Sequence, residues 1–510
     1  MKKRILALML LACMLTTLLC GCGGGNGSEE PAEETRAGTN ELVVGIAQDL
    51  DDSLDPHKAV AAGTKEVMFN VFEGLVKVSS DGDLIPAVAE NYTISPDGLT
   101  YTFTIREGIT FHNGDAVAAE DVVYSIERCA AASETGIVQV AALSAIQTME
   151  TPDERTVVIT LAEPNNEFLV YLTLAVLPAD YTEQDTKPVG TGPFKFVSRS
   201  AQESIVMEKN GAYWGTPAKL DKVTFKIFEN ADSIIMSLQS GAVDLFAHLT
   251  STQTSQLGEE FYVVEGAMNL VQALYLNHAE KPFDDPRVCE ALCWAIDRQQ
   301  IFDLAFDGYG FPIGSSVYPS FGKYFEEDLV SYYSQDIEKA KSLLAEAGYA
   351  DGFSMTITVP SNYQPHIDTA TVLAEQLKAV GVTAEVQLVE WGTWLSDVYT
   401  ARNFQTTITG LTASTMTARY LLERFTTDHV NNFVNYSNPE YDELFRKAQA
   451  TMDDAEQTAV YKEMLAHLTE NAANVYIQDL ADLIAVREGL EGLEFYPTYV
   501  LNLATVGWAN

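Results

Sequence analysis

Alternating apolar and polar residues predict several strands in the first half of the chain. In LTYTFTIREG, Tyr101, Phe103 and Ile105 fall on one face, as every second residue does in an extended strand. The segments 156–163 (TVVITLAE) and 221–229 (DKVTFKIFE) repeat the alternation, and the run ELVVGIAQ upstream of them has the length of a buried strand. The pattern therefore predicts strands at four places.

Helical and strand-like segments alternate in the second half. Residues 336–348 predict a helix, with Asp336 near its N-cap and Gly348 as its C-terminal stop. The strand-like FSMTITV, a helix that ends at about Val380 and the strand-like VTAEVQLVE follow in that order. This alternation is typical of βα units, so we expect a largely parallel sheet in this region.

Two further helical segments are predicted by the spacing of apolar residues. One is TKEVMFNVFEGLVKV, and the other is a long block from about residue 440 to residue 474. In the first segment, the apolar residues that recur at helical spacing are Val67, Met68, Val71, Phe72 and Leu75.

The N-terminus has the pattern of an exported protein. Basic residues 2–4 precede an apolar run of 15 residues, Ile5–Leu19, whereas a helix needs about 20 apolar residues to cross a bilayer. A basic start, a short apolar core and a small-residue end indicate a secretory signal peptide, here 1–21. Its end resembles the lipobox of bacterial lipoproteins, in which a cysteine is lipidated and becomes the new N-terminus. Cys22 fits this role and Cys20 fits it less well; an ordinary secretion signal with incidental cysteines is the alternative.

The segment after the signal peptide is expected to be a spacer. Residues 22–40 are rich in Gly and Glu, lack apolar periodicity and are expected to form a flexible spacer.

Length and charge limit what the rest of the chain does. The chain has 510 residues, and a single hydrophobic core stops growing near ~250–300 residues, so we expect at least two lobes. A net charge of −41 repels nucleic acid and anionic lipid headgroups, so no nucleic-acid partner is expected.

Catalytic and metal-binding motifs do not appear in the sequence. HExxH, GxSxG, the Walker phosphate loop and a GxGxxG that opens a helix are all missing. Cys289 and Cys293 lie four residues apart in a predicted helix, and we expect both to be small buried residues. We therefore predict a protein that is not an enzyme and has no cofactor and no bound metal. An extracytoplasmic hydrolase that uses scattered carboxylates is the alternative of another class.

Four stretches together resemble one protein family. They are 68–129, 188–245, 275–319 and 433–453, and the resemblance runs in order through residues 41–510. The chain is similar to the extracytoplasmic solute-binding proteins of ABC importers, in the group that includes peptide and nickel binders (family 5).

The resemblance implies an α/β fold of the periplasmic-binding-protein type. Two lobes enclose a ligand cleft, and lobe I carries an extra subdomain. The expected ranges are 41–70, 185–265 and 482–510 for lobe I, 71–184 for the extra subdomain, and 266–481 for lobe II.

The resemblance also implies a function. A monomer held to the cell membrane by the lipid on Cys22, at the cell surface or in the periplasm, captures an oligopeptide or a related small solute and delivers it to the permease subunits. Peptide binders of this family pair the α-ammonium of the peptide with an aspartate. The corresponding stretch here is 406–438, and its residues 410–418 contain no Asp and no Pro. This difference leaves a nickel or other metal chelate, or another acidic small molecule, as the alternative ligand.

Arg419 is the leading candidate contact, because its planar guanidinium suits a carboxylate; a surface arginine on a short helix is the alternative. Trp391 and Trp394 are candidate aromatic walls of the cleft, or else core residues. The other candidate ligand contacts neighbour Arg419, follow the first strand or match family positions: Tyr420, Asp49, Leu54, Asn70 and Asn277.

Overall fold

The computed structural model describes residues 40–509 apart from 48, 51–52, 60, 132–136, 138–139, 166, 229, 414–416 and 499. The signal peptide, Cys22 and nearly all of the spacer therefore lie outside the described residues, and the predictions made about them stay predictions. Within the described part of the chain, no helix has the length and apolar character that a bilayer crossing requires.

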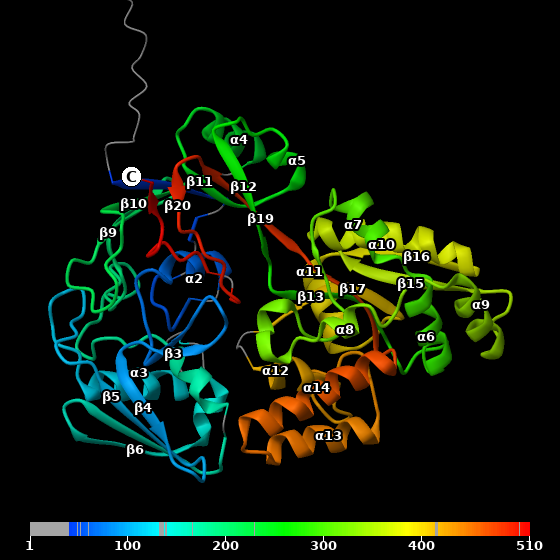
Figure 1. Ribbon diagram of the computed structural model, residues 1–510, viewed down its shortest axis with the longest axis horizontal. Helices are drawn as coiled ribbons and strands as arrows, with labels where there is room; N and C mark the ends of the chain where they lie inside the picture. The colour runs from blue at the N-terminus through cyan, green and yellow to red at the C-terminus, as the bar shows by residue number, and fades with distance from the viewer. Residues whose placement is uncertain are drawn as a thin grey trace, which may run out of the picture. The chain divides into compact units, whose positions relative to one another are not determined.

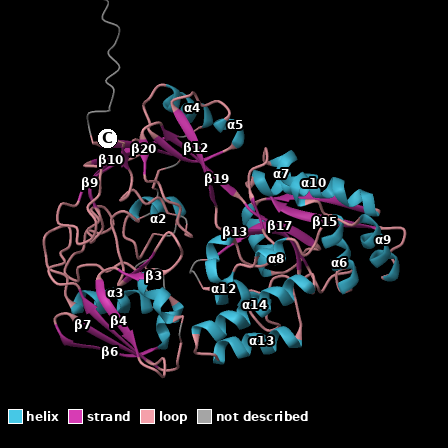
Figure 2. Cartoon of the chain, in the orientation of Figure 1, coloured by secondary structure: helices cyan, strands magenta, loops and turns pink. Residues whose placement is uncertain are grey.

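The described chain contains both helices and strands (Figures 1 and 2). Two short strand pairs are β2 (Val76–Val78) with β3 (Leu84–Pro86) and β20 (Leu490–Glu491) with β21 (Gly507–Trp508). The helices are α2 (Ala62–Met68), α3 (Ala119–Ala130), α4 (Ala231–Gln239), α5 (Ser251–Thr254), α6 (Pro286–Ala295), α7 (Arg298–Ala305), α8 (Glu327–Val330), α9 (Ile337–Glu346), α10 (Gln364–Leu377), α11 (Trp391–Thr393), α12 (Ala418–Leu422), α13 (Pro439–Ala450) and α14 (Asp454–Glu470).

A mixed sheet of seven strands contains the strand predicted at the start of the fold. Its strands are β1 (Glu41–Ile46), β8 (Phe194–Ser200), β9 (Ser204–Lys209), β10 (Lys222–Ile227), β11 (Leu245–Leu249), β12 (Phe261–Ala267) and β19 (Ala481–Arg487). The order is β12-β19-β11-β1-β10-β9-β8, and β1 runs parallel to both β10 and β11. Leu42 and Val44 of β1 and Val223 and Phe225 of β10 are buried, so alternate residues of these strands build one core.

A second sheet of six strands contains the predicted βα units. Its strands are β13 (Leu270–Leu276), β14 (Phe311–Pro312), β15 (Phe353–Pro360), β16 (Val382–Val389), β17 (Thr406–Thr412) and β18 (Asn474–Asp479), in the order β14-β18-β13-β17-β15-β16. β15 pairs in parallel with both β16 and β17, which confirms the parallel arrangement. The predicted caps of α9 are also confirmed: Asp336 accepts from the backbone N–H of Lys339 at 2.9 Å, and Gly348 has a φ of +92°.

A third, antiparallel sheet is inserted in the sequence between β1 and β8 of the seven-stranded sheet. Its strands are β4 (Ala89–Ile94), β5 (Thr100–Ile105), β6 (Ile146–Asp153) and β7 (Thr156–Leu161), in the order β4-β5-β7-β6, and α3 packs on β6 and β7. Tyr101, Phe103 and Ile105 are all fully buried on one face of β5, as the alternation predicts.

Two chain segments cross from the seven-stranded sheet to the six-stranded sheet. β12 continues into β13, and β18 continues into β19. At the crossing, the N–H of Met268 donates to the carbonyl of Leu480 at 2.8 Å, and the N–H of Leu270 donates to the buried carboxyl of Asp479 at 3.0 Å. The two crossings are therefore hydrogen-bonded to each other.

Two helical predictions need correction. α2 ends at Met68, although the apolar pattern continues to Leu75. Beyond the helix, Gly74 lies against another segment, because a Cβ on Gly74 would be 2.6 Å from the backbone of Leu172 and Thr173. The block from 440 to 474 is divided into α13 and α14, because Asp453 caps the second helix by accepting from the N–H of Glu456 at 2.9 Å.

The cysteines of the described chain are free thiols in the interior. Cys129, Cys289 and Cys293 are all buried, as predicted for the last two. Burial raises the pKa of Cys129 to about 11 and that of Cys289 to about 12, so both thiols are protonated at neutral pH.

Candidate functional site

Three parallel strands of the six-stranded sheet end along one edge. β15 ends at Pro360 and β16 at Val389, and these two residues are partners in the register; β17, on the other side of β15, ends at Thr412. Ligands of open α/β sheets bind beyond the carboxyl ends of the strands. The residues that follow these three strands are therefore candidates for the site.

Tyr363, Trp391 and Trp394 form an aromatic stack beyond β15 and β16. The rings of Trp391 and Trp394 are parallel within 4°, with centroids 5.2 Å apart, and Tyr363 meets Trp391 edge-on at 5.3 Å. Trp394 is buried, and its Nε1 donates to the hydroxyl of Thr407 on β17 at 2.9 Å. Trp394 is thus the fixed base of the stack, Trp391 is half-buried, and Tyr363 is 40% exposed. Tyr363 was missed from the sequence, although it follows β15 as Trp391 follows β16.

Arg419 and Tyr420 lie on α12, which follows β17. Thr417 caps this short helix, and its side chain accepts from the N–H of Tyr420 at 3.4 Å. The Nε of Arg419 lies 3.4 Å from Oε2 of Glu423, and the arginine side chain is 36% exposed. The guanidinium of Arg424 lies 5.3 Å from the centroid of the Tyr420 ring. Both predicted residues are therefore half-buried and belong to a charged helix beyond the same sheet edge.

A cavity of about 340 Å³ is lined in part by Thr417, the residue that caps α12. We call it the acidic cavity, because carboxylates are common among the residues that line it. Its lining residues are Asp81, Gly82, Asp83, Leu84, Tyr92, Glu167, Leu169, Val170, Ser320, Phe321, Gly322, Lys323, Tyr324, Thr417, Asp454 and Gln457. They come from widely separated stretches of the chain, so no local sequence signal could have pointed to it.

Glu167 differs from the other residues of the acidic cavity. Its Oε2 accepts from the hydroxyl of Tyr461, in α14, at 3.0 Å, whereas its Oε1 is buried and has no hydrogen-bond partner among the described residues. Burial raises the pKa of this carboxyl, while the bond from Tyr461 and the positive charge and backbone of Arg419 oppose the rise. Glu167 is thus a partly satisfied acid close to Arg419.

Asp49 and Leu54, predicted to border the cleft, lie in the interior near the end of β1. Asp49 is paired with the guanidinium of Arg199 at 3.0 Å and accepts from the N–H of Gln202 at 2.7 Å. Burial acts to raise the pKa of Asp49, but the bonds from Arg199 and from backbone N–H groups hold it below its usual value. Leu54 is 1% exposed in the core of the seven-stranded sheet. A ligand contact of either residue stays a prediction.

Asn70 and Asn277 each fix a backbone segment. Both are buried. Asn70 donates to the carbonyl of Leu501 at 2.8 Å and accepts from the N–H of Leu503 at 2.9 Å. Asn277 donates to the carbonyl of Phe404 at 2.7 Å. These bonds give both asparagines a structural role, and their contact with a ligand stays a prediction.

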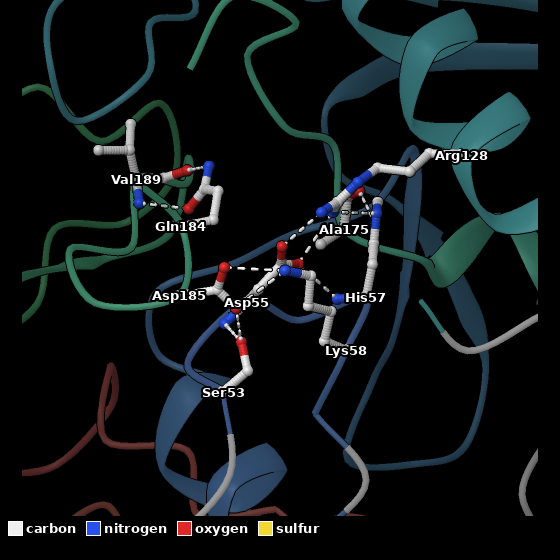
Figure 3. Close-up of polar contacts among 9 residues, drawn as sticks. All are labelled: Ser53, Asp55, His57, Lys58, Arg128, Ala175, Gln184, Asp185 and Val189. Carbon is white, nitrogen blue, oxygen red and sulfur yellow. Dashed lines mark hydrogen bonds and ion pairs between the residues drawn. The ribbon is translucent and has the colours of Figure 1, made fainter. Parts of the chain in front are cut away.

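Polar residues after β1 form a buried cluster (Figure 3). Arg128 of α3 donates to both carboxylate oxygens of Asp55 and to Nδ1 of His57 at 3.0 Å. Because Nδ1 accepts, the proton of the His57 ring is on Nε2, which donates to the carbonyl of Ala175 at 2.8 Å. Burial and the charge of Arg128 lower the pKa of His57 to about 4, although the bond to Ala175 opposes this. The cluster joins the segment after β1 to α3.

The described residues include aromatic faces and charged groups beyond the strand ends, which are groups able to contact a solute. No set of three or more His, Cys, Asp or Glu side chains in the described part of the chain is placed to hold a metal ion. Two α/β sheets joined by paired crossing segments, with aromatic and charged residues beyond the strand ends, define a class: the two-lobed proteins that enclose a solute.

The comparisons with known proteins specify this class. The sequence profile of the bacterial extracellular solute-binding proteins, family 5 (middle region), matches residues 83–433. The chain therefore belongs to this family, the family 5 solute-binding proteins of ABC importers, and the two-lobed fold expected from the sequence is confirmed.

Individual relatives bind different solutes. The chain is 30% identical over 448 residues to the glutathione-binding protein GsiB of Pectobacterium atrosepticum, a match that covers 83% of this chain and 86% of that protein. DppA of Helicobacter pylori, solved with the peptide STSA, is 25% identical with a TM-score of 0.73, and the match covers 92% of this chain and 98% of DppA. AgaA from A.tumefacien R10, solved with agropinic acid, is 27% identical with a TM-score of 0.72, covering 92% and 99%.

Proposed function

We propose that this protein is the lipid-anchored substrate-binding component of an ABC importer, which captures an oligopeptide or a related small solute and passes it to the permease. The ligands of two relatives, glutathione for GsiB and the peptide STSA for DppA, support a peptide-like solute.

The observation that carries the proposal is the aromatic stack at the carboxyl edge of the parallel strands. The buried Trp394 fixes Trp391 in place, and Tyr363 extends the surface toward solvent. A large aromatic face held rigid before binding loses little conformational freedom when a solute packs on it.

Arg419 is the proposed contact for an acidic group of the solute. Glu423 lies near its Nε, and its side chain is 36% exposed. A guanidinium has five N–H donors in a planar fork, more than this one contact uses, and it binds a carboxylate with two parallel bonds.

The test begins with mass spectrometry of solute that co-purifies with the protein, followed by calorimetric titration of that solute. We expect Trp391→Ala to weaken binding about tenfold and Arg419→Ala to weaken it roughly thirtyfold, since losing one partner of a desolvated pair costs about 2–5 kcal/mol. Arg419→Lys should restore little, because an ammonium lacks the fork.

The matched control is Tyr332→Ala, which removes an aromatic ring that is 42% exposed and packs on Tyr333 instead of Trp391. It should bind as the wild type does. Failure to find any solute that binds would contradict the proposed function. Binding that is equal in all variants would leave the function standing and remove Trp391 and Arg419 from the site.

The lipid anchor is proposed on Cys22, on the strength of the 15-residue apolar run and the small residue before it. Cys22→Ser should release the protein from the membrane fraction, because a protein without the acyl chains loses about 0.8 kcal/mol for each methylene otherwise buried in lipid. A variant that stays fully bound to membranes in high salt would refute the anchor.

A second candidate ligand is an acidic small molecule or a metal chelate with free acid groups. Arg419 beyond the strand ends favours it, as does the agropinic acid with which AgaA was solved. The mass of the co-purified solute distinguishes the two.

A further inference from the structure

The acidic cavity has an excess of negative charge. Its lining carboxylates are Asp81, Asp83, Glu167 and Asp454, whereas Lys323 is the one Lys or Arg among its described lining residues. Lys323 pairs with Asp454. Its positive charge therefore does not neutralise the other three carboxylates. A concave site lined by one sign of charge concentrates solutes of the opposite sign.

Aromatic rings form part of the same wall. Tyr92 lines the cavity from β4, and Phe321 and Tyr324 line it from the segment before α8. The faces of aromatic rings attract cations, and this attraction strengthens when water is removed. Charge and ring chemistry therefore favour the same kind of group.

Glu167 adds a specific acceptor. Tyr461 occupies Oε2, and Oε1 is buried with no hydrogen-bond partner among the described residues. Native proteins leave few buried polar atoms unsatisfied, so such an atom beside a cavity calls for an explanation. A donor brought by the solute would provide one.

We propose that the acidic cavity is a subsite for an ammonium group of the solute, and that Oε1 of Glu167 accepts a hydrogen bond from it. This inference rests on the proposed function, because it assigns a part of the solute to a part of the same protein. It also gives a peptide-like solute an acidic partner in a chain whose stretch 410–418 contains no aspartate. The ammonium comes either from the N-terminus of a peptide or from a lysine side chain.

Four tripeptides distinguish these sources: Ala-Ala-Ala, N-acetyl-Ala-Ala-Ala, Ala-Lys-Ala and N-acetyl-Ala-Lys-Ala. Calorimetric titration of the full mature protein should show tighter binding, by tenfold or more, for at least one ammonium-bearing peptide than for N-acetyl-Ala-Ala-Ala. Preference for Ala-Ala-Ala assigns the N-terminus, and preference for N-acetyl-Ala-Lys-Ala assigns the side chain.

Glu167→Gln tests the acceptor. It keeps the shape of the side chain and an oxygen for Tyr461, and it removes the charge, so the preference for the ammonium should fall at least tenfold. Glu163→Gln is the matched control, because Glu163 is exposed four residues upstream and does not line the cavity. Asp83→Asn, at an exposed lining position, is a second variant in case Glu167→Gln does not fold, and it should reduce the preference less.

The outcomes separate the inference from the function. If wild type binds the tripeptides with no preference for an ammonium, or if Glu167→Gln and Asp83→Asn keep the full preference, the subsite is refuted and Glu167 serves only to hold Tyr461. If wild type binds none of the tripeptides while another solute binds, the peptide assignment and the subsite fail together and solute binding stands.

Discussion

At the scale of a residue, the buried Glu73 and the half-buried Glu167 show how differently one side chain is used. Glu167 has one bonded oxygen and one unsatisfied oxygen. Glu73, in contrast, accepts from Lys77 at 3.0 Å, Tyr213 at 2.7 Å and Trp214 at 2.6 Å, and its side chain is 4% exposed. Glu73 therefore has the bonding that a purely structural carboxylate requires, and Glu167 does not.

This difference predicts that Glu73→Gln destabilises the fold. The amide would turn an NH₂ group toward donors that now bind an oxygen, so the free energy of unfolding should fall by about 3 kcal/mol. Urea denaturation at neutral pH measures the loss. Lys77→Met should cost less, since the Lys77 side chain is 30% exposed; a loss under about 0.5 kcal/mol for Glu73→Gln would contradict this account.

At the scale of elements, the apolar pattern located six strands and some of the helices, but it did not locate the ends of two helical segments. β5, β7, β10, β15 and β16 lie where alternation or short apolar runs placed them, because a half-buried strand must alternate. The break at Asp453 depends on a cap, and the close approach of a distant segment to Gly74 depends on the folded chain; apolar periodicity records neither.

The candidate site was predictable only in part. Trp391 was found because it follows a predicted strand, whereas Arg419 was found because it adjoins residues 410–418, where the family resemblance leads one to expect an aspartate. Glu167 and Tyr461 are 294 positions apart, and their contact exists only in the folded chain.

The cluster between the segment after β1 and α3 predicts a pH dependence. The pKa of His57 is about 4 in the folded protein and about 6.5 in an unfolded chain. Between these values the unfolded state binds the proton and the folded state does not, so stability is lost as pH falls from 6.5 toward 4. The slope from one such histidine is at most about 1.4 kcal/mol per pH unit.

Urea denaturation of His57→Gln should therefore show a shallower fall in stability between pH 6.5 and 4.5 than wild type does. Glutamine keeps an acceptor for Arg128 and a donor for Ala175 and has no proton to gain. His429→Gln, at a half-buried position outside the cluster, is the control. Identical slopes for wild type and His57→Gln would show that His57 does not titrate in this way.

At the scale of the whole molecule, the paired crossing segments and the two-lobed family fold predict a change of shape on binding. The two crossings are bonded to each other through Met268 and Leu480, so they should bend together. A saturating solute should compact the protein and stabilise it by about 2.7 kcal/mol when present at a hundredfold excess over its dissociation constant.

Small-angle scattering with and without the co-purified solute measures the compaction, and thermal melting measures the stabilisation. A solute that does not bind, at the same concentration, is the control. A rise in melting temperature with unchanged scattering would argue against closure and leave binding intact.

The buried thiols have a practical consequence. Cys129 and Cys289 carry almost no thiolate at neutral pH, and Cys293 is buried with them. Thiolate is the reactive form, so a chain that begins after Cys22 should resist maleimide reagents. A single cysteine introduced at the 50% exposed Leu388, close to the aromatic stack in sequence, would then take up one fluorophore alone. The labelled protein becomes an optical sensor for its own solute, which can be found by screening mixtures without knowing its structure in advance.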